Sequence, residues 1–176
     1  MPTQNTYKMK KFFIATAILT AMACQQDKIA YVDNIRLMDG YKEKVAVESK
    51  FTARKEVFNK KRDSISQVFQ MEAQAMEAQV KGMSQQKAQE TYAMLQQKGQ
   101  RMGQELQQEE QLLQMQGQTE MDSVIQKVKK EITEFGKANG YTFILGGGEG
   151  GSVLYGADSK DVTDDILAVL NKDTKE

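Results

Sequence analysis

A long central stretch without proline constrains the fold of this chain most strongly. From Asn34 to about Asn139 no proline interrupts the sequence, and the good helix formers Gln, Glu, Lys, Ala and Met dominate it. Nothing in this stretch resembles the alternating pattern of a strand. The sequence therefore predicts that residues 34–140 are helical and elongated.

Apolar residues recur at heptad spacing in two arms of this stretch, which is the pattern of a coiled coil. In the first arm a four-residue step, which locally straightens a supercoil, divides the pattern. The pattern is formed by Phe51, Phe58, Ile65, Phe69, Met76 and Met83 in the first arm and by Leu95, Met102, Leu106, Leu113, Met121, Val128 and Phe135 in the second. We therefore expect an antiparallel helical hairpin.

The turn of the hairpin is expected at residues 81–84. Gly82 would end the first helix in a left-handed conformation, and Ser84 would cap the second. This position gives two arms of similar length, 35–81 and 85–138, each roughly 70 to 80 Å long at 1.5 Å per residue. Three other glycines are competing break points: Gly99, Gly103 and Gly117.

Methionine and glutamine accumulate in the part of the hairpin far from its base. The contacts of methionine are soft and adaptable, so these side chains either fill the seam of a solvated coiled coil or form a flexible surface for apolar partners. The candidate binding residues are Phe69, Met71, Met76, Met83, Met94 and Met102. The base of the first arm is basic, and this charge belongs either to an ordinary solvated face or to one directed at anionic lipid. Its residues are Lys50, Arg54, Lys55, Lys60, Lys61 and Arg62.

Both ends of the chain contain short apolar runs. Segments 28–33, 141–145 and 152–155 read as strands, and Thr163 is expected to cap an amphipathic helix that follows. The predicted fold class is α+β, with a small β body made by the two ends, in which a β hairpin and the last helix occupy 141–176. One such body buries too little apolar surface to be stable alone, which predicts a shared core between subunits. We expect Val32, Phe143, Ile144, Leu154 and Ile166 in it.

Gly146, Gly148 and Gly151 match the G-x-G-x-x-G spacing of a dinucleotide-binding turn. That motif requires the third glycine to open a helix, whereas a strand-like segment follows here. The glycines are therefore expected to serve as turn residues between two strands. No nucleotide role is predicted.

Composition argues against most enzyme classes. The chain has no His and no Trp, and Cys24 is its one Cys, so the commonest residues for acid-base, thiol and metal chemistry are scarce. Its 24 basic and 24 acidic side chains cancel, which leaves no general field for nucleic acid. We expect no enzyme activity, no cofactor, no metal and no nucleic-acid partner.

The N-terminal residues 1–23 resemble an export signal. A basic start at Lys10 and Lys11 is followed by an apolar run and by small residues before Cys24. Translation from Met9 would suffice for such a signal. The expected outcome is a lipoprotein that is attached to a membrane through Cys24. The alternative is a plain secretory signal with an incidental cysteine.

Segments 28–44 and 152–172, together with the Gln-rich hairpin between them, resemble the OmpH family of periplasmic chaperones. The resemblance implies a jellyfish-like homotrimer, in which a central β body carries three helical hairpins as tentacles around a cavity. It further implies that unfolded outer-membrane or periplasmic proteins are held there without ATP. The zero net charge and the lipoprotein-like signal depart from the family's pattern. The predicted function is a membrane-anchored holdase in the periplasm of a Gram-negative bacterium, and the alternative is a coiled-coil structural or adaptor lipoprotein of the cell envelope.

Overall fold

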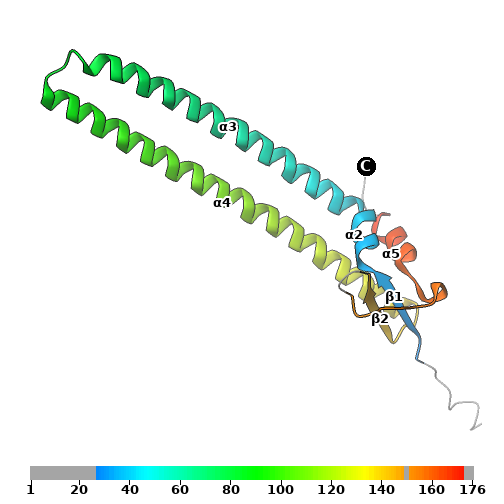
Figure 1. The fold of residues 1–176 in the computed structure, drawn as a ribbon. Coiled ribbons are helices and arrows are strands. Elements are labelled where there is room, and N and C mark those ends of the chain that lie inside the picture. The colour runs from blue at the N-terminus through cyan, green and yellow to red at the C-terminus, as the bar shows by residue number, and fades with distance from the viewer. Residues whose placement is uncertain (1–26, 149–150, 173–176) are drawn as a thin grey trace, which may run out of the picture.

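A computed structural model describes residues 27–148 and 151–172. It consists of a long helical hairpin joined to a small body, as Figure 1 shows. The elements in chain order are β1 (Ile29–Asp33), α2 (Asn34–Gly40), α3 (Lys42–Val80), α4 (Gln85–Ala138), β2 (Phe143–Gly147), the 3-10 helix η1 (Asp158–Lys160) and α5 (Thr163–Leu170). The predicted α+β class, with a hairpin and a body built from both ends of the chain, is confirmed. The expected signal and Cys24 lie outside the described residues.

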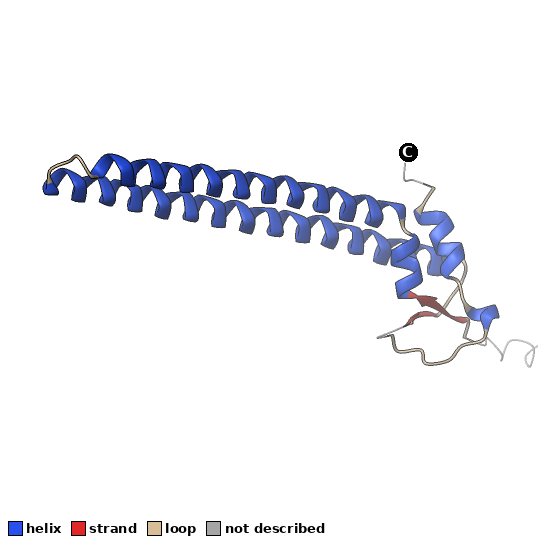
Figure 2. Ribbon diagram, turned by 45° about the horizontal axis from the view of Figure 1, so that its top comes forward, coloured by secondary structure: helices blue, strands red, loops and turns tan. Residues whose placement is uncertain are grey.

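Helices α3 and α4 lie side by side along the whole hairpin in both views (Figures 1 and 2). They contain 39 and 54 residues, which corresponds to about 58 Å and about 81 Å. Among the described residues of these two helices, Phe58 is buried in α3, and Val124, Val128 and Gly136 are buried near the base of α4. Most of the hairpin therefore has a half-buried seam and no closed core.

The first arm is interrupted at its base, which the sequence did not predict. Tyr41 adopts an extended conformation (φ −80°, ψ 110°) between α2 and α3, and its side chain is buried in the body. Asn171 stabilises this break on both sides: its Oδ1 accepts a hydrogen bond from the N–H of Lys42, and its Nδ2 donates to the carbonyl of Gly40, each at 3.0 Å. The expected single helix from residue 35 to 81 is therefore wrong, because a distant side chain caps the break.

The turn of the hairpin occupies residues 81–84, between α3 and α4. Gly82 has no left-handed backbone, contrary to expectation, and its N–H donates to the carbonyl of Gln79 at 3.3 Å in a tight right-handed turn. Ser84 is the N-cap of α4, but its side chain forms no cap hydrogen bond. Its carbonyl instead accepts the first helical bond, from the N–H of Ala88 at 2.9 Å. The turn is therefore made by backbone hydrogen bonds.

The sheet of the body has two parallel strands. β1 pairs with β2 in a register that runs from Ile29 opposite Phe143 to Asp33 opposite Gly147. One face points into the subunit, where Ala30 is buried, while Ile29 and Phe143 are exposed on the other. The buried core comprises Ala30, Val32, Leu37, Tyr41, Val124, Val128, Val162, Ile166 and Leu170.

The expected third strand at residues 152–155 does not form in the described chain, and neither does the expected β hairpin. Val153 makes a single bridge to Gly147. Gly151 lies so close to β2 that a Cβ there would be 2.6 Å from the backbone carbon of Gly147, so the loop folds onto the strand end instead of running beside it. Leu154 and Tyr155 are 98% and 90% exposed. The short apolar run at 152–155 predicts a strand, but in the described chain its pairing with β2 is limited to this one bridge.

Helix α5 starts one residue earlier than the sequence predicts. Thr163 is its first residue and not its cap. The capping acceptor is Asp161, whose Oδ1 receives the N–H of Thr163 at 2.9 Å. Because the hydroxyl of Thr163 does not cap its own helix, it can accept a hydrogen bond from the backbone N–H of Asp33 in β1.

Candidate functional site: the seam and the sides of the hairpin

A partly buried hydrogen-bond network joins the base of the hairpin to the last helix. The N–H of Asp33 donates to Oγ1 of Thr163 at 2.9 Å, and this hydroxyl donates to Oδ1 of Asp161 at 2.5 Å. The other oxygen of Asp161 accepts from the guanidinium of Arg36 at 2.8 Å. Burial raises the pKa of Asp161, but the hydrogen bonds from Thr163 and Arg36 outweigh it, so the net shift is downward. The network holds the start of α2 at a fixed place on α5.

Two phenylalanines of α3 pack on glycines of α4 in the seam. A Cβ at Gly117 would lie 2.5 Å from ring carbons of Phe51, and one at Gly99 would lie 2.9 Å from the ring of Phe69. A side chain at either glycine would therefore displace the facing ring. At Gly103, in contrast, an added Cβ would meet no atom within 4 Å, so this glycine lies outside these contacts.

Ion pairs cross the hairpin at intervals from its base toward its tip. Arg54 binds Glu120 through both terminal nitrogens, at 3.0 and 2.7 Å. The full set is Lys127–Glu43, Arg54–Glu120, Lys61–Glu109 and Lys98–Glu72. The hydrogen bond from Lys127, followed by the one from Tyr41, lowers the pKa of Glu43. Each pair joins one residue of α3 to one of α4, so the set is matched to the observed register and adds weak electrostatic support to it.

The candidate binding residues divide into two classes. Met71 and Met94 are 62% and 64% exposed, so their side chains are available to a partner. The others are half-buried: Phe69, Met76, Met83 and Met102. Phe69 packs on Gly99 in the seam. The structure therefore separates seam residues from surface residues, which the heptad pattern did not.

Further large apolar side chains are exposed on the hairpin, and the heptad pattern did not predict them. They are Val45, Val57, Val68, Tyr92, Leu112 and Met115. Val57 and Leu112 directly precede Phe58 and Leu113, which the heptad pattern placed in the seam. An apolar residue next to a seam position is the signal that could have found them, since neighbouring positions of a helix point to different sides.

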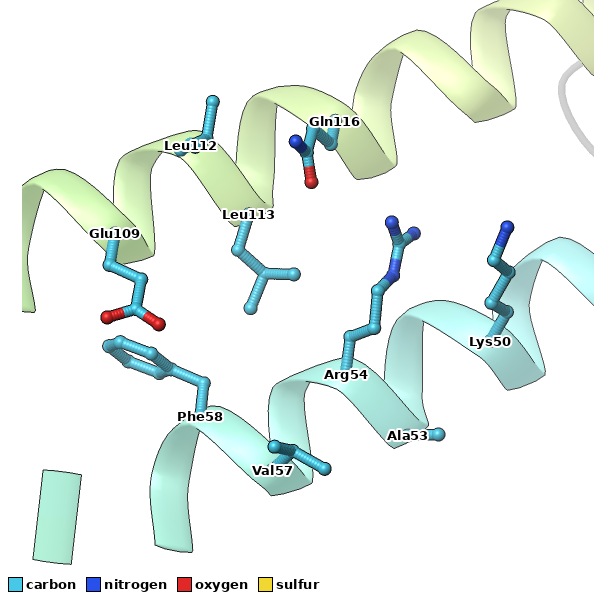
Figure 3. A pocket seen from close by; sticks show the side chains of 9 residues that line it. All are labelled: Lys50, Ala53, Arg54, Val57, Phe58, Glu109, Leu112, Leu113 and Gln116. Atoms are coloured by element: carbon cyan, nitrogen blue, oxygen red, sulfur yellow. The ribbon is translucent and has the colours of Figure 1, made fainter. Parts of the chain in front are cut away.

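Some of these side chains line a groove between α3 and α4, shown in Figure 3. Its volume is about 490 Å³. In the close-up, Leu113 and Gln116 extend from α4 toward α3, and Phe58 lies near Glu109. The lining residues are Lys50, Ala53, Arg54, Val57, Phe58, Glu109, Leu112, Leu113 and Gln116. The groove is apolar along its walls and has charged groups at its ends.

The cluster of basic residues near the start of the first arm is partly neutralised by ion pairs. Arg54 and Lys61 form cross-hairpin pairs, and Arg62 lies 3.2 Å from Asp63. Among the described residues no ion pair is formed by the other three, Lys50, Lys55 and Lys60. These three cations remain available for an external anionic group.

The residues predicted for a shared core lie in different places. Val32 and Ile166 are buried within the single chain, at 2% and 0% exposure, and Ile144 packs against the same core. Phe143 and Leu154 are exposed, at 55% and 98%. A surface between subunits would involve the exposed pair directly, and the buried ones only through the core behind it.

Two features are absent from the part of the chain that the structure describes. None of its helices has the length and apolar character needed to cross a bilayer. It also contains no cluster of three or more potential metal-ligating His, Cys, Asp or Glu side chains.

Comparisons with known proteins place this architecture in a family. A crystal structure of an OmpH-like protein from Caulobacter crescentus CB15, a proposed outer membrane chaperone, matches with a TM-score of 0.74 at 18% identity. The match covers 85% of this chain and 87% of that one. A comparison with curated protein sequences finds no match. The family model for outer membrane proteins of the OmpH-like type matches residues 28–170. This chain is therefore a member of the OmpH-like family.

Proposed function

We propose that this protein is an ATP-independent holdase chaperone that keeps unfolded outer-membrane or other envelope proteins soluble in the periplasm. One observation carries the proposal: solvated arms project from the body and expose large apolar side chains, including Val57, Met71, Met94 and Leu112. These groups are spread along both arms, and Val57 and Leu112 line one groove. Many weak apolar contacts along adaptable arms suit partners without a fixed sequence.

We propose further that three copies assemble through the body. The outer face of the β1–β2 sheet supports this, because Ile29, Phe143 and Leu145 are exposed there and Leu154 and Tyr155 extend nearby into solvent. A two-stranded sheet with one uncovered apolar face is marginal alone. The number three follows from the family resemblance.

The membrane attachment is a separate part of the proposal and rests on the sequence before Cys24. A thioether-linked lipid there would hold the arms near the membrane surface. Cys24→Ser is expected to move the protein from the membrane pellet to the soluble fraction, and intact-mass measurement of the wild type is expected to show the acyl groups. An unmodified wild-type N-terminus would overturn this part alone.

The function is tested by diluting a urea-unfolded outer-membrane barrel into the purified protein and measuring light scattering. The wild type is expected to keep the barrel soluble without ATP. A variant that lacks residues 69–106 retains three of the four cross-hairpin pairs and the groove of Figure 3, so it should keep a folded body while losing the part of this activity that depends on the outer arms. Equal protection by the shortened variant would show that the outer arms do not hold clients.

The second candidate function is a structural or adaptor lipoprotein whose hairpin spaces or docks envelope components. The ion pairs that cross the hairpin favour it, because a spacer benefits from a defined hairpin. In this case the wild type would fail to keep the barrel soluble.

A further inference from the structure

The groove between α3 and α4 has the dimensions of a binding site for a short chain segment. Its volume of about 490 Å³ falls within the usual range for ligand sites, roughly 300 to 1,000 Å³. Along α4 it extends from Glu109 to Gln116, about 10 Å at 1.5 Å per residue. Its two edges are Val57 and Leu112, which are 67% and 49% exposed.

The charged residues of the groove differ in whether they have an ion-pair partner. Arg54 is paired with Glu120, and Glu109 is paired with Lys61 at 2.6 Å. Lys50 lines the groove at the end nearer the body and forms no ion pair in the described chain. The groove therefore combines an apolar slot with one uncompensated positive charge at a known end.

We propose that this groove binds an extended segment of an unfolded client, with two apolar side chains two residues apart and an acidic residue toward Lys50. The inference rests on the proposed holdase function and names where and how a client is first engaged. In an extended chain, side chains on one face recur about every 7 Å, so two of them fit the 10 Å slot.

The polar groups around the groove favour a peptide over a purely apolar ligand. Lys50 and Gln116 offer donors, and Gln116 also offers an acceptor, to the backbone groups that an extended peptide leaves unpaired. An acyl chain has no such groups. The positive charge of Lys50 favours an acidic residue in the bound segment. Such charge complementarity affects the choice among client segments more than the affinity for any one of them.

Synthetic peptides test the proposal against the full chain by isothermal titration calorimetry. The probe has the sequence Gly-Asp-Thr-Leu-Thr-Leu-Gly, which places its Asp and both Leu on one face of an extended chain, and two matched peptides replace its Asp with Lys or both Leu with Ser. We expect the acidic probe to bind about two- to fivefold more tightly than the Lys peptide, as for an exposed ion pair. The Ser peptide is expected not to bind.

Variants of the groove identify the site. Lys50→Glu should abolish or reverse the preference for the acidic probe, whereas Lys55→Glu makes the same charge change outside the groove and should preserve it. Replacing Val57 and Leu112 together with Gln should weaken binding roughly tenfold through lost apolar contact. Val45→Gln, at an exposed position outside the groove, should leave the affinity unchanged. Circular dichroism checks that each variant is folded.

Four outcomes would overturn the proposal. Lys50→Glu without effect on the peptide preference excludes the charge contact. If the Val57 and Leu112 double variant has an altered sedimentation mass, a second copy of the chain covers the groove. If the same variant loses binding to lipid vesicles, the groove contacts a membrane surface. A wild type that protects the barrel but does not discriminate the peptides refutes the groove alone, whereas a wild type that fails to protect the barrel refutes the holdase function itself.

Discussion

The backbone N–H of Asp33 donates a hydrogen bond to the hydroxyl of Thr163, across 130 residues of sequence, at 2.9 Å. Thr163 is fully buried. Asp33 meanwhile uses its own side chain to cap α2, accepting from the N–H groups of Ile35 and Arg36 at 3.0 Å each. The junction of β1 and α2 is therefore held from both directions, by a local cap and by the last helix.

Thr163→Val should destabilise the body because it preserves shape but removes the acceptor of the partly buried N–H of Asp33 and the hydroxyl donor to Asp161. The expected loss is about 1 to 3 kcal/mol in the free energy of unfolding, measured by urea denaturation. Thr133→Val is the matched control, since that threonine is exposed and bonds only to its own helix. An equal effect of both substitutions would contradict the role of the buried hydrogen bond.

Asp161 should make stability depend on pH. Its folded pKa is lowered relative to an unfolded value of about 3.9. Its contribution is therefore fully present above the unfolded pKa and is lost as pH falls through the folded pKa. Asp161→Asn should cost about 1 kcal/mol at neutral pH, and the difference from wild type should shrink below about pH 4. A difference that stays constant in urea titrations down to pH 3 would refute this.

Two glycines of α4 should respond in opposite ways to alanine. Gly103→Ala meets no atom and should stabilise the hairpin by about 0.5 to 1 kcal/mol through helix propensity. Gly117→Ala gains the same propensity but pushes against the ring of Phe51, so its net effect should be destabilising. Thermal unfolding of the two variants gives the comparison. Stabilisation by both would mean that Phe51 can move away at no cost.

Exposed and half-buried methionines should have different roles. Replacing Met71 and Met94 with Gln keeps helix propensity and removes exposed apolar surface, so barrel protection should weaken while the melting temperature stays the same. Replacing Met76 and Met102 with Gln places polar groups in the half-buried seam and should lower the melting temperature. Identical behaviour of the two double variants would show that exposure does not determine client contact.

Phe143→Asp and Ile144→Asp distinguish a surface between subunits from a core within one. Phe143 is exposed on the outer face of the sheet, so a charge there should dissociate the proposed trimer and leave each subunit helical. Ile144 packs inward, and a Cβ on Gly136 would lie 3.3 Å from it, so an unpaired charge there should cost several kcal/mol and unfold the body. Sedimentation and circular dichroism report the two effects. Tyr92→Asp, on the arm, is the control and should leave the sedimentation mass unchanged.

Local sequence signals predicted the hairpin and its turn, because long runs of helix formers need no distant partner to be recognised. The capping details at Gly82, Ser84 and Thr163 differ locally, but the two larger failures involve distant contacts. The break at Tyr41 depends on Asn171, and the run that contains Leu154 makes only a single bridge to β2 in the described chain. A propensity is read from neighbours in sequence, whereas these outcomes are decided by neighbours in space.

The candidate site was predicted only in part, for a related physical reason. Heptad spacing identifies which side chains face the partner helix, but says little about those on either side of the seam. The groove around Val57 and Leu112 therefore had no periodic signal. The contacts of Gly99 and Gly117 with phenylalanine rings were also missed, since a glycine inside a helical run reads first as a possible break.

The parallel pairing of β1 with β2 has a consequence for the order in which the chain can fold. Val32 pairs with Gly146, so the sheet closes a loop that contains the entire hairpin. For a flexible loop on the order of 100 residues, closure costs about 4 kcal/mol of entropy. When α3 and α4 have already paired, the two strands lie close together. The contacts between the arms then offset most of this entropy cost. The slowest step in making the body should therefore be the pairing of the arms.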